Sequence, residues 1–252
     1  MKEEKNYDDI ICGRNSVLEL LKSNKDINKI WIERGEKHGS IKEIIAKAKE
    51  ARIVIVEVEK AKLDAMTTEN HQGVIASVPP FDYCEIEDIL ELAKSKNETP
   101  FVLLLDGIED PHNLGAIIRT AETAGVHGIV IPKRRSASVN STVSKVSAGA
   151  TTYMKIARVN NLNETIRKLK ENGLWIIGTD GAAKTQYYEQ DLTGPIGIVI
   201  GSEGFGMSKL VKENVDILIK IPMKGQITSL NASVAAGIVM YEVVKQNISK
   251  KL

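Results

Sequence analysis

This 252-residue chain has only two cysteines and no long apolar run. Cys12 and Cys84 lie far apart and have no CxxC partner, so we expect structural thiols rather than a disulfide framework or a cysteine-rich zinc site. No apolar run approaches the roughly 20 residues that a bilayer-spanning helix needs. The first residues, MKEEKNYDD, are charged, and no apolar core follows them. We therefore expect no secretory signal and a cytoplasmic, reducing environment.

Several catalytic motifs are also missing from the sequence. It contains no GxSxG nucleophile elbow, no HExxH zinc motif, no GxxxxGK[ST] phosphate loop and no GxGxxG dinucleotide fingerprint. The four histidines show no metal-ligand spacing, so we expect no metal site.

The net charge is close to zero but unevenly distributed. Thirty-four basic and 33 acidic side chains give +1, which taken whole argues against a strongly basic nucleic-acid-binding protein. Residues 1–80 are neutral, residues 81–99 carry −4 and residues 100–252 carry +5. Residues 132–158 hold six basic and no acidic side chains. Such groups contact phosphates and sugars, and a solvated flexible loop is the alternative interpretation.

Charge and apolar periodicity divide the chain into three parts. Residues 1–80 predict a compact α/β domain ending at Pro79-Pro80, and residues 81–99 predict an acidic linker with one amphipathic helix over Ile86–Ala93. Residues 100–252 predict a larger α/β domain with a parallel sheet, because continuous apolar runs alternate with helical patterns. The expected strands of this domain are Phe101–Leu105, Gly128–Ile131, Leu174–Gly178, Ile196–Ile200 and Ile217–Ile221.

The segment from Asp106 to Arg119 follows the first of these strands. Asn113 is the expected N-cap of the next helix. Arg119 faces away from the apolar stripe of that helix and has small residues at i−4, i−3 and i+4, which leaves its guanidinium room to meet a ligand. A surface Arg119 paired with Glu122 is the alternative interpretation.

Two further segments follow strands in the same domain. The run IGSEGFG at 200–206 places Glu203 among glycines, which permit a close approach of the backbone to a ligand. A glycine-rich turn with a solvated Glu203 is the alternative. The run IPMKGQITSLN at 221–231 enters the C-terminal helix. Thr228 or Ser229 is expected to cap that helix, which leaves Asn231 in its first turn free to bond a ligand.

In order and spacing, these three segments resemble the motifs of the SpoU (TrmH) RNA 2′-O-ribose methyltransferases. The N-terminal part is similar to the substrate-binding domain of that family, which is like ribosomal protein L30e. The pieces that carry this second similarity are Gly13-Arg14-Asn15 and His71-Gln72-Gly73. Similarity along the full length points to the bacterial branch that methylates a guanosine of 23S rRNA.

The resemblance implies a fold, a cofactor and partners. The fold is an N-terminal L30e-like α/β domain followed by an α/β-knot methyltransferase domain, whose C-terminal part is threaded into a deep trefoil knot. The cofactor is S-adenosylmethionine without a metal, and the partners are RNA and a second copy in a homodimer, with no membrane. By motif position the expected cofactor-binding residues are Ile200, Gly201, Ile221, Met223 and Leu230, with Thr179 and Gly181 on the adenosine side. The expected RNA-binding residues are Lys133, Arg134, Arg135, Lys145 and Arg14.

The resemblance also assigns catalytic roles. By analogy with the family, Arg119 activates the ribose 2′-hydroxyl. Because a guanidinium hardly deprotonates, our hypothesis is that Arg119 binds the adjacent phosphate and stabilises the developing alkoxide. Asn113 and Glu203 would hold Arg119, while Ser229 and Asn231 would orient the ribose.

Three other functions are alternatives to this one. Methylation of a tRNA or of another rRNA nucleotide would use the same catalytic residues. A non-catalytic RNA-binding protein of ribosome assembly would not need the complete set of five polar residues. A dinucleotide oxidoreductase is disfavoured by the missing GxGxxG motif.

Overall fold

The computed structural model describes residues 9–22, 26–35, 39–78 and 81–249. The chain divides into two compact units, Met1–Asp82 and Tyr83–Leu252, and each is described by itself. The Pro79-Pro80 pair, which the sequence marks as the end of the first domain, lies outside the described residues.

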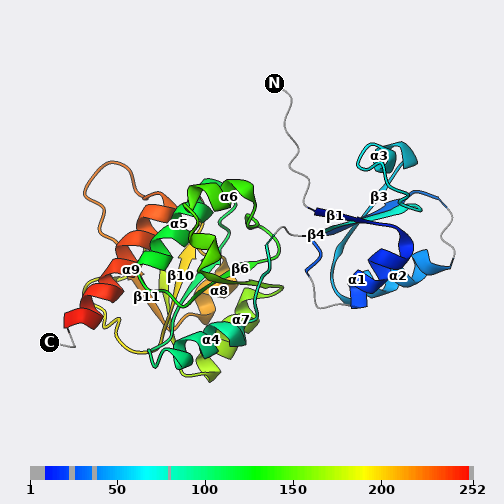
Figure 1. The fold of residues 1–252 in the computed structure, drawn as a ribbon. Coiled ribbons are helices and arrows are strands. Elements are labelled where there is room, and N and C mark those ends of the chain that lie inside the picture. Colours follow the sequence, from blue (N-terminus) through cyan, green and yellow to red (C-terminus); the bar gives the residue numbers. More distant parts are fainter. Residues whose placement is uncertain (1–8, 23–25, 36–38, 79–80, 250–252) are drawn as a thin grey trace. The chain divides into compact units, whose positions relative to one another are not determined.

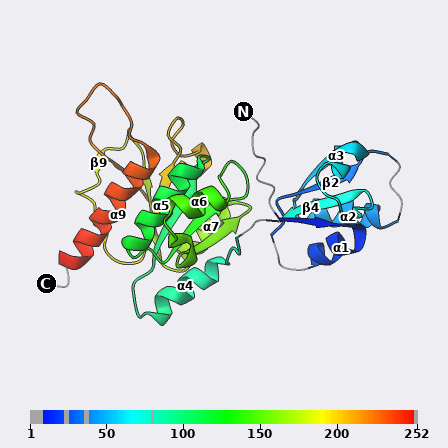
Figure 2. The ribbon, with the colours of Figure 1, turned by 45° about the horizontal axis from the view of Figure 1, so that its top comes forward.

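The first unit is a four-stranded sheet of order β1-β4-β2-β3, covered by helices. Its strands are β1 (Asp9–Cys12), β2 (Lys29–Glu33), β3 (Val54–Val58) and β4 (Val74–Val78). Only the β2–β3 pair is parallel. Helices α1 (Arg14–Lys22) and α2 (Ser40–Glu50) lie on one face and α3 (Lys60–Asp64) on the other (Figure 2).

Two short elements of this unit leave no clear pattern in the sequence. Strand β1 and helix α3 are only four and five residues long, too short to show a clear period. Helix α2 begins at Ser40, and Gly39 occupies its capping position.

The second unit is built on a seven-stranded sheet of order β7-β6-β5-β10-β8-β11-β9. Every pairing in it is parallel, as the continuous apolar runs predict. Its strands are β5 (Phe101–Asp106), β6 (Gly128–Pro132), β7 (Lys155–Val159), β8 (Trp175–Thr179), β9 (Thr185–Gln186), β10 (Ile196–Gly201) and β11 (Ile217–Lys220).

Helices cover both faces of this sheet (Figure 1). Helices α4 (Ile86–Ser95), α7 (Leu162–Glu171) and α8 (Lys209–Asn214) pack on the face that carries Leu104. Helices α5 (Pro111–Thr123), α6 (Ser141–Val146) and α9 (Ala232–Ser249) lie on the opposite face. Leu103 and Leu104 are both fully buried, although neighbouring side chains of a strand point to opposite faces. The sheet therefore has a core on each side.

The acidic segment 81–99 differs from the expected linker. Helix α4 belongs to the second unit, and its Ile86, Ile89 and Ala93 are buried in the core of that unit. Gly128 on β6 makes room for this packing, because a Cβ there would lie 2.5 Å from the Ile89 side chain. The negative charge that suggested a linker lies on the exposed face of the amphipathic helix, for example at Glu87 and Glu91.

The basic segment 132–158 also differs from a flexible loop, because it holds α6, a 3₁₀ turn at Ala150–Thr152 and the start of β7. Among the described residues no helix combines the length and apolarity needed to cross a membrane. The trefoil knot stays a prediction from the resemblance, since sheet order and register do not define how the chain is threaded.

Candidate active site

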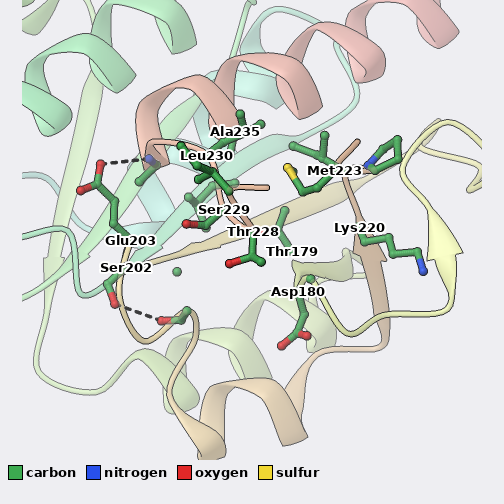
Figure 3. Close-up of a pocket in the computed structure, with 18 of the residues that line it drawn as sticks. Thr179, Asp180, Ser202, Glu203, Lys220, Met223, Thr228, Ser229, Leu230 and Ala235 are labelled. Atoms are coloured by element: carbon green, nitrogen blue, oxygen red, sulfur yellow. Dashed lines mark hydrogen bonds between the residues drawn. The ribbon is translucent and has the colours of Figure 1, made fainter. Parts of the chain in front are cut away.

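The three motif segments meet at the carboxyl edge of the parallel sheet. They follow β5, β10 and β11, and the loop after β8 joins them there. Ligands of open α/β sheets bind in this position, outside the carboxyl ends of the strands. The loops after β8, β10 and β11 enclose a cavity of about 660 Å³. Figure 3 shows Ser202 and Glu203 at one end of it, Met223 and Lys220 at the other, and Thr179, Thr228 and Ser229 between.

A cluster of three side chains borders this cavity. The Asn113 amide donates to Glu203 Oε1 at 3.0 Å, and the Asn231 amide donates to Asn113 Oδ1 at 2.8 Å. The Asn231 amide also donates to Glu203 Oε1, which accepts in addition from the backbone N–H of Ala232 at 3.2 Å. One side chain from each motif therefore enters a single hydrogen-bonded network.

The ends of two helices position this cluster. Asp110 caps α5 by accepting from the backbone N–H of His112 at 2.9 Å, and Pro111 occupies the first helical position. Asn113 is therefore inside the first turn rather than at the predicted N-cap, and its amide is free to reach Glu203. Asn231 Oδ1 accepts from the backbone N–H groups of Ser233 at 3.0 Å and Val234 at 3.3 Å. Asn231 thus caps α9, the role predicted for Thr228 or Ser229.

A tight turn after β10 presents Glu203. Backbone hydrogen bonds join Ser202 and Gly206 in both directions, at 3.0 and 2.9 Å. A Cβ on Gly201 would lie 2.2 Å from the carbonyl carbon of Gly206, so only glycine fits there without moving the turn. The backbone N–H of Ser208 donates to Asp106 at 2.6 Å, which ties the far end of the turn to β5.

The electrostatics of the large cavity are set in part by Asp180. Burial alone would raise the pKa of this carboxyl, but hydrogen bonds from Lys212 and from the backbone N–H of Ala182 hold the pKa below its ordinary value. Asp180 therefore carries its negative charge at neutral pH. In the described part of the chain, no group of three or more His, Cys, Asp or Glu could hold a metal ion.

Comparisons with known proteins identify the fold that carries this site. Residues 100–241 match the model of the SpoU rRNA methylase family, and residues 10–84 match that of an RNA 2′-O-ribose methyltransferase substrate-binding domain. The chain belongs to the SpoU rRNA methylase family. A relative from Bacillus subtilis, YacO, is named as a TrmH family tRNA/rRNA methyltransferase. The two sequences are 49% identical over 238 residues, which cover 94% of this chain and 96% of the relative.

Solved SpoU structures share this fold. The SpoU methyltransferase AviRb of Streptomyces viridochromogenes, crystallised with AdoMet, superposes with a TM-score of 0.60 at 23% identity over 95% of this chain and 90% of that one. The A. aeolicus TrmH/SpoU tRNA modifying enzyme superposes with a TM-score of 0.57 at 29% identity over 66% of this chain and 85% of that one. These matches confirm the α/β fold, with an N-terminal domain followed in the sequence by a SpoU domain. The protein is an RNA methyltransferase of the SpoU/TrmH family.

The structure brings the predicted cofactor residues of this SpoU methylase together. All seven of them line the large cavity, and so do the predicted catalytic residues Glu203 and Ser229. The seven are Thr179, Gly181, Ile200, Gly201, Ile221, Met223 and Leu230. Their contacts with a ligand stay a prediction.

Arg119 lies apart from this group. It is exposed on α5 and lines neither the large cavity nor the smaller one described below. Within the described residues no hydrogen bond or ion pair joins it to Asn113, Glu203 or Glu122, so the predicted partners of Arg119 bond to one another and to Asn231 instead. Gly115 serves helix packing rather than leaving space for Arg119, because a Cβ there would lie 2.7 Å from Val146 of α6.

The predicted RNA-binding residues are spread over several elements of the SpoU fold. Arg135 lines a second cavity of about 280 Å³, and its φ of 57° places it in the left-handed region. Lys133 and Arg134 precede it in the same loop, and Lys145 is exposed on α6. Arg14 begins α1 in the first unit, and its Nε donates to the Gln72 carbonyl at 2.9 Å.

Sequence reasoning overlooked Phe205 in the second cavity. Its ring is 92% exposed at the tip of the turn after β10. An aromatic residue between two glycines in a motif loop was the available signal.

Proposed function

We propose that this protein transfers a methyl group from S-adenosylmethionine to the ribose 2′-hydroxyl of a guanosine in 23S rRNA. One observation carries the proposal: the large cavity is lined by all seven predicted cofactor residues and bordered by the Asn113–Glu203–Asn231 cluster. A cofactor bound in this cavity would lie next to the polar groups that we propose orient the ribose.

The lining of the large cavity fits S-adenosylmethionine. Its volume of about 660 Å³ lies within the range of about 300–1,000 Å³ that small-ligand sites occupy. Apolar side chains of Ile200, Ile221 and Leu230 suit an adenine ring, and hydroxyls of Thr179 and Ser229 suit polar groups. Gly181 also lines the cavity, and a Cβ there would meet no atom within 4 Å. S-adenosylmethionine supplies an electrophilic methyl on its sulfonium.

The chain's own residues would then position and stabilise the RNA ribose. A 2′-hydroxyl is a poor nucleophile and must lose its proton as it attacks. Arg119 is exposed and has donors to spare, so it would bind the adjacent phosphate and stabilise the developing alkoxide. Asn113 and Glu203 would hold Asn231 rather than Arg119. Asn231 would in turn orient the ribose. When the methyl donor and the 2′-hydroxyl are held close together and in line, positioning alone supplies much of the rate of methyl transfer.

The proposal includes a homodimer. Arg119 lines neither cavity of its own chain, which fits a site that residues from a second copy complete. Helix α9 also exposes apolar side chains, with Val234 50%, Tyr241 49% and Ile248 58% exposed, as an uncovered interface would.

The choice of 23S rRNA rests on the resemblance to that bacterial branch, and it implies a cytoplasmic location. The match of residues 10–84 to a substrate-binding model supports an RNA partner. Methylation of tRNA is the alternative, since YacO is named for both RNA classes.

Calorimetry combined with a transfer assay tests the proposal. We expect the wild-type protein to bind S-adenosylmethionine and to transfer tritiated methyl to RNA from a strain that lacks the gene. A protein that binds the RNA but not S-adenosylmethionine would be a non-catalytic RNA-binding protein, and the proposal would be wrong.

A further inference from the structure

The second cavity, of about 280 Å³, lies directly beside the large one. The two share Ser202, Glu203 and Ala232 in their linings. A molecule in the second cavity would therefore meet one in the first across Glu203. Its volume falls just below the range of about 300–1,000 Å³ typical of complete small ligands, so it suits a single base.

Phe205 forms an unpaired apolar surface on this cavity. Its ring is 92% exposed, although it stands on a turn that the Ser202–Gly206 hydrogen bonds hold in shape. Exposed aromatic rings on rigid loops provide stacking surfaces for the unpaired bases of RNA, and each stacked base is worth about 1–3 kcal/mol.

The charged groups lining the cavity are one cation, Arg135, and three carboxylates, Glu109, Asp110 and Glu203. Glu203 is engaged by hydrogen bonds from Asn113, Asn231 and the backbone of Ala232. Asp110 is engaged as the N-cap of α5. Glu109 is exposed beside it, and within the described residues no hydrogen bond or ion pair occupies its carboxylate. Arg135 keeps a left-handed backbone with φ of 57°, a conformation that is costly for a residue with a Cβ and clusters at functional sites.

A carboxylate discriminates among the four bases by their donors. It only accepts hydrogen bonds, through two oxygens side by side. Guanine presents two adjacent donors, N1–H and the N2 amino group, and can satisfy both oxygens. Adenine and cytosine each place a ring acceptor beside their amino group, and uracil has one N–H between two carbonyls. A carboxylate at this edge therefore favours guanine.

We propose that the second cavity holds the base of the target nucleotide, with Phe205 as the stacking surface and Glu109 as the acceptor that selects guanine. Arg135 binds a phosphate of the same strand. This inference rests on the proposed methyl transfer, because the base must sit where its ribose reaches the large cavity. It adds what the motifs leave open, namely which residues select the base.

Phe205→Ala tests the stacking role, with Phe205→Trp as the conservative variant. RNA from a strain lacking the gene is the substrate, and the readouts are kcat/KM for methyl transfer and calorimetric binding of S-adenosylmethionine. We expect Phe205→Ala to lower kcat/KM by about 5- to 160-fold, the equivalent of about 1–3 kcal/mol, and Phe205→Trp to retain most of it. Binding of S-adenosylmethionine and the melting temperature should stay unchanged in both, because the ring is exposed and does not line the large cavity.

Glu109→Gln tests the selection of guanine, with Glu122→Gln as the matched control. Glu122 is an exposed acid on α5 that lines neither cavity. In an RNA fragment carrying the target guanosine, replacement of that base by hypoxanthine removes the N2 amino group. The wild type and Glu122→Gln should lose activity on that RNA, whereas Glu109→Gln should discriminate much less between the two RNAs.

Normal kcat/KM in Phe205→Ala, or unchanged discrimination in Glu109→Gln, would overturn this inference while leaving the proposed function intact. A wild-type protein that neither binds S-adenosylmethionine nor methylates RNA would instead refute the proposed function, and the inference with it.

Discussion

The side-chain amide of Asn231 donates a hydrogen bond to the side-chain oxygen Oδ1 of Asn113 at 2.8 Å, across 118 positions of sequence. Both amides also donate to one oxygen of Glu203. Because Asn231 additionally caps α9, its side chain links the start of that helix to the start of α5 and to the turn after β10. The shape of the site thus depends on a residue that also stabilises the fold.

Substitution at Asn231 can separate these two roles. Asn231→Ala removes the cap, which is worth about 0.5–2 kcal/mol, and the links to Asn113 and Glu203. Asn231→Asp keeps an acceptor for Ser233 and Val234 but cannot donate, and it adds a negative charge beside Glu203. We expect methyl transfer to fall in both variants, while the melting temperature falls through loss of the cap in the Ala variant and through repulsion from Glu203 in the Asp variant. An Asp variant with wild-type turnover would show that the linked amides are not needed.

Gly201→Ala should weaken binding of S-adenosylmethionine. The new Cβ would lie 2.2 Å from Gly206, so the turn after β10 must shift into a different shape. Gly204→Ala in the same turn is the matched control, because a Cβ there meets nothing within 4 Å. Calorimetry should show reduced affinity for the Gly201 variant alone. Equal affinity in both would mean that the shape of the turn does not matter to the cofactor.

Arg119→Lys tests the planar fork of the guanidinium, because the variant keeps the charge and loses the bidentate geometry. We expect kcat for methyl transfer to fall on the order of 100-fold, with affinity for S-adenosylmethionine unchanged. Arg167→Lys, at an exposed position on α7, should behave as wild type. Near-normal turnover of Arg119→Lys would contradict the proposed role.

Joint replacement of Arg134 and Arg135 by Ala should weaken RNA binding and leave S-adenosylmethionine binding intact. Each lost phosphate contact also reduces the dependence of affinity on salt. Filter binding of RNA at several salt concentrations, beside calorimetry with the cofactor, measures both effects. Parallel loss of RNA and cofactor binding would instead indicate damage to the fold.

Cys84 should be chemically quiet at neutral pH. Burial raises the pKa of its thiol from about 9.0 to about 11, so the reactive thiolate is scarce below that range. In a Cys12→Ser variant, alkylation of Cys84 should be very slow at pH 7.5 and should accelerate as the pH approaches 11. Rapid labelling at pH 7.5 would place the thiol in a more open environment.

The sequence pattern locates five of the seven parallel strands, because each of the five is a continuous apolar run. Leu103 and Leu104 of β5 show why, since both are fully buried, one on each face. The pattern misleads where charged residues that suggest a linker or a surface belong to a packed helix or strand. The acids near α4 mark the exposed side of a packed helix rather than a linker. Strand β7 was missed because Lys155 and Arg158 lie within it, and they read as part of a basic surface.

At the site, the motifs predict which residues gather but not how they pair. Asn113 looks like an N-cap because polar residues at helix starts usually are, yet Asp110 caps α5 and Pro111 follows it. Which of two nearby polar residues caps the helix depends on the backbone conformation of the folded chain, which the sequence pattern does not reveal.

The most direct test is to map 2′-O-methyl groups in total RNA from strains with and without the gene. We expect one guanosine of 23S rRNA to lose its methyl group in the deletion strain. We also expect the wild-type gene, but not Arg119→Lys, to restore the mark, as the proposed function requires. Loss of methylation from tRNA alone, or no change in any RNA, would contradict it.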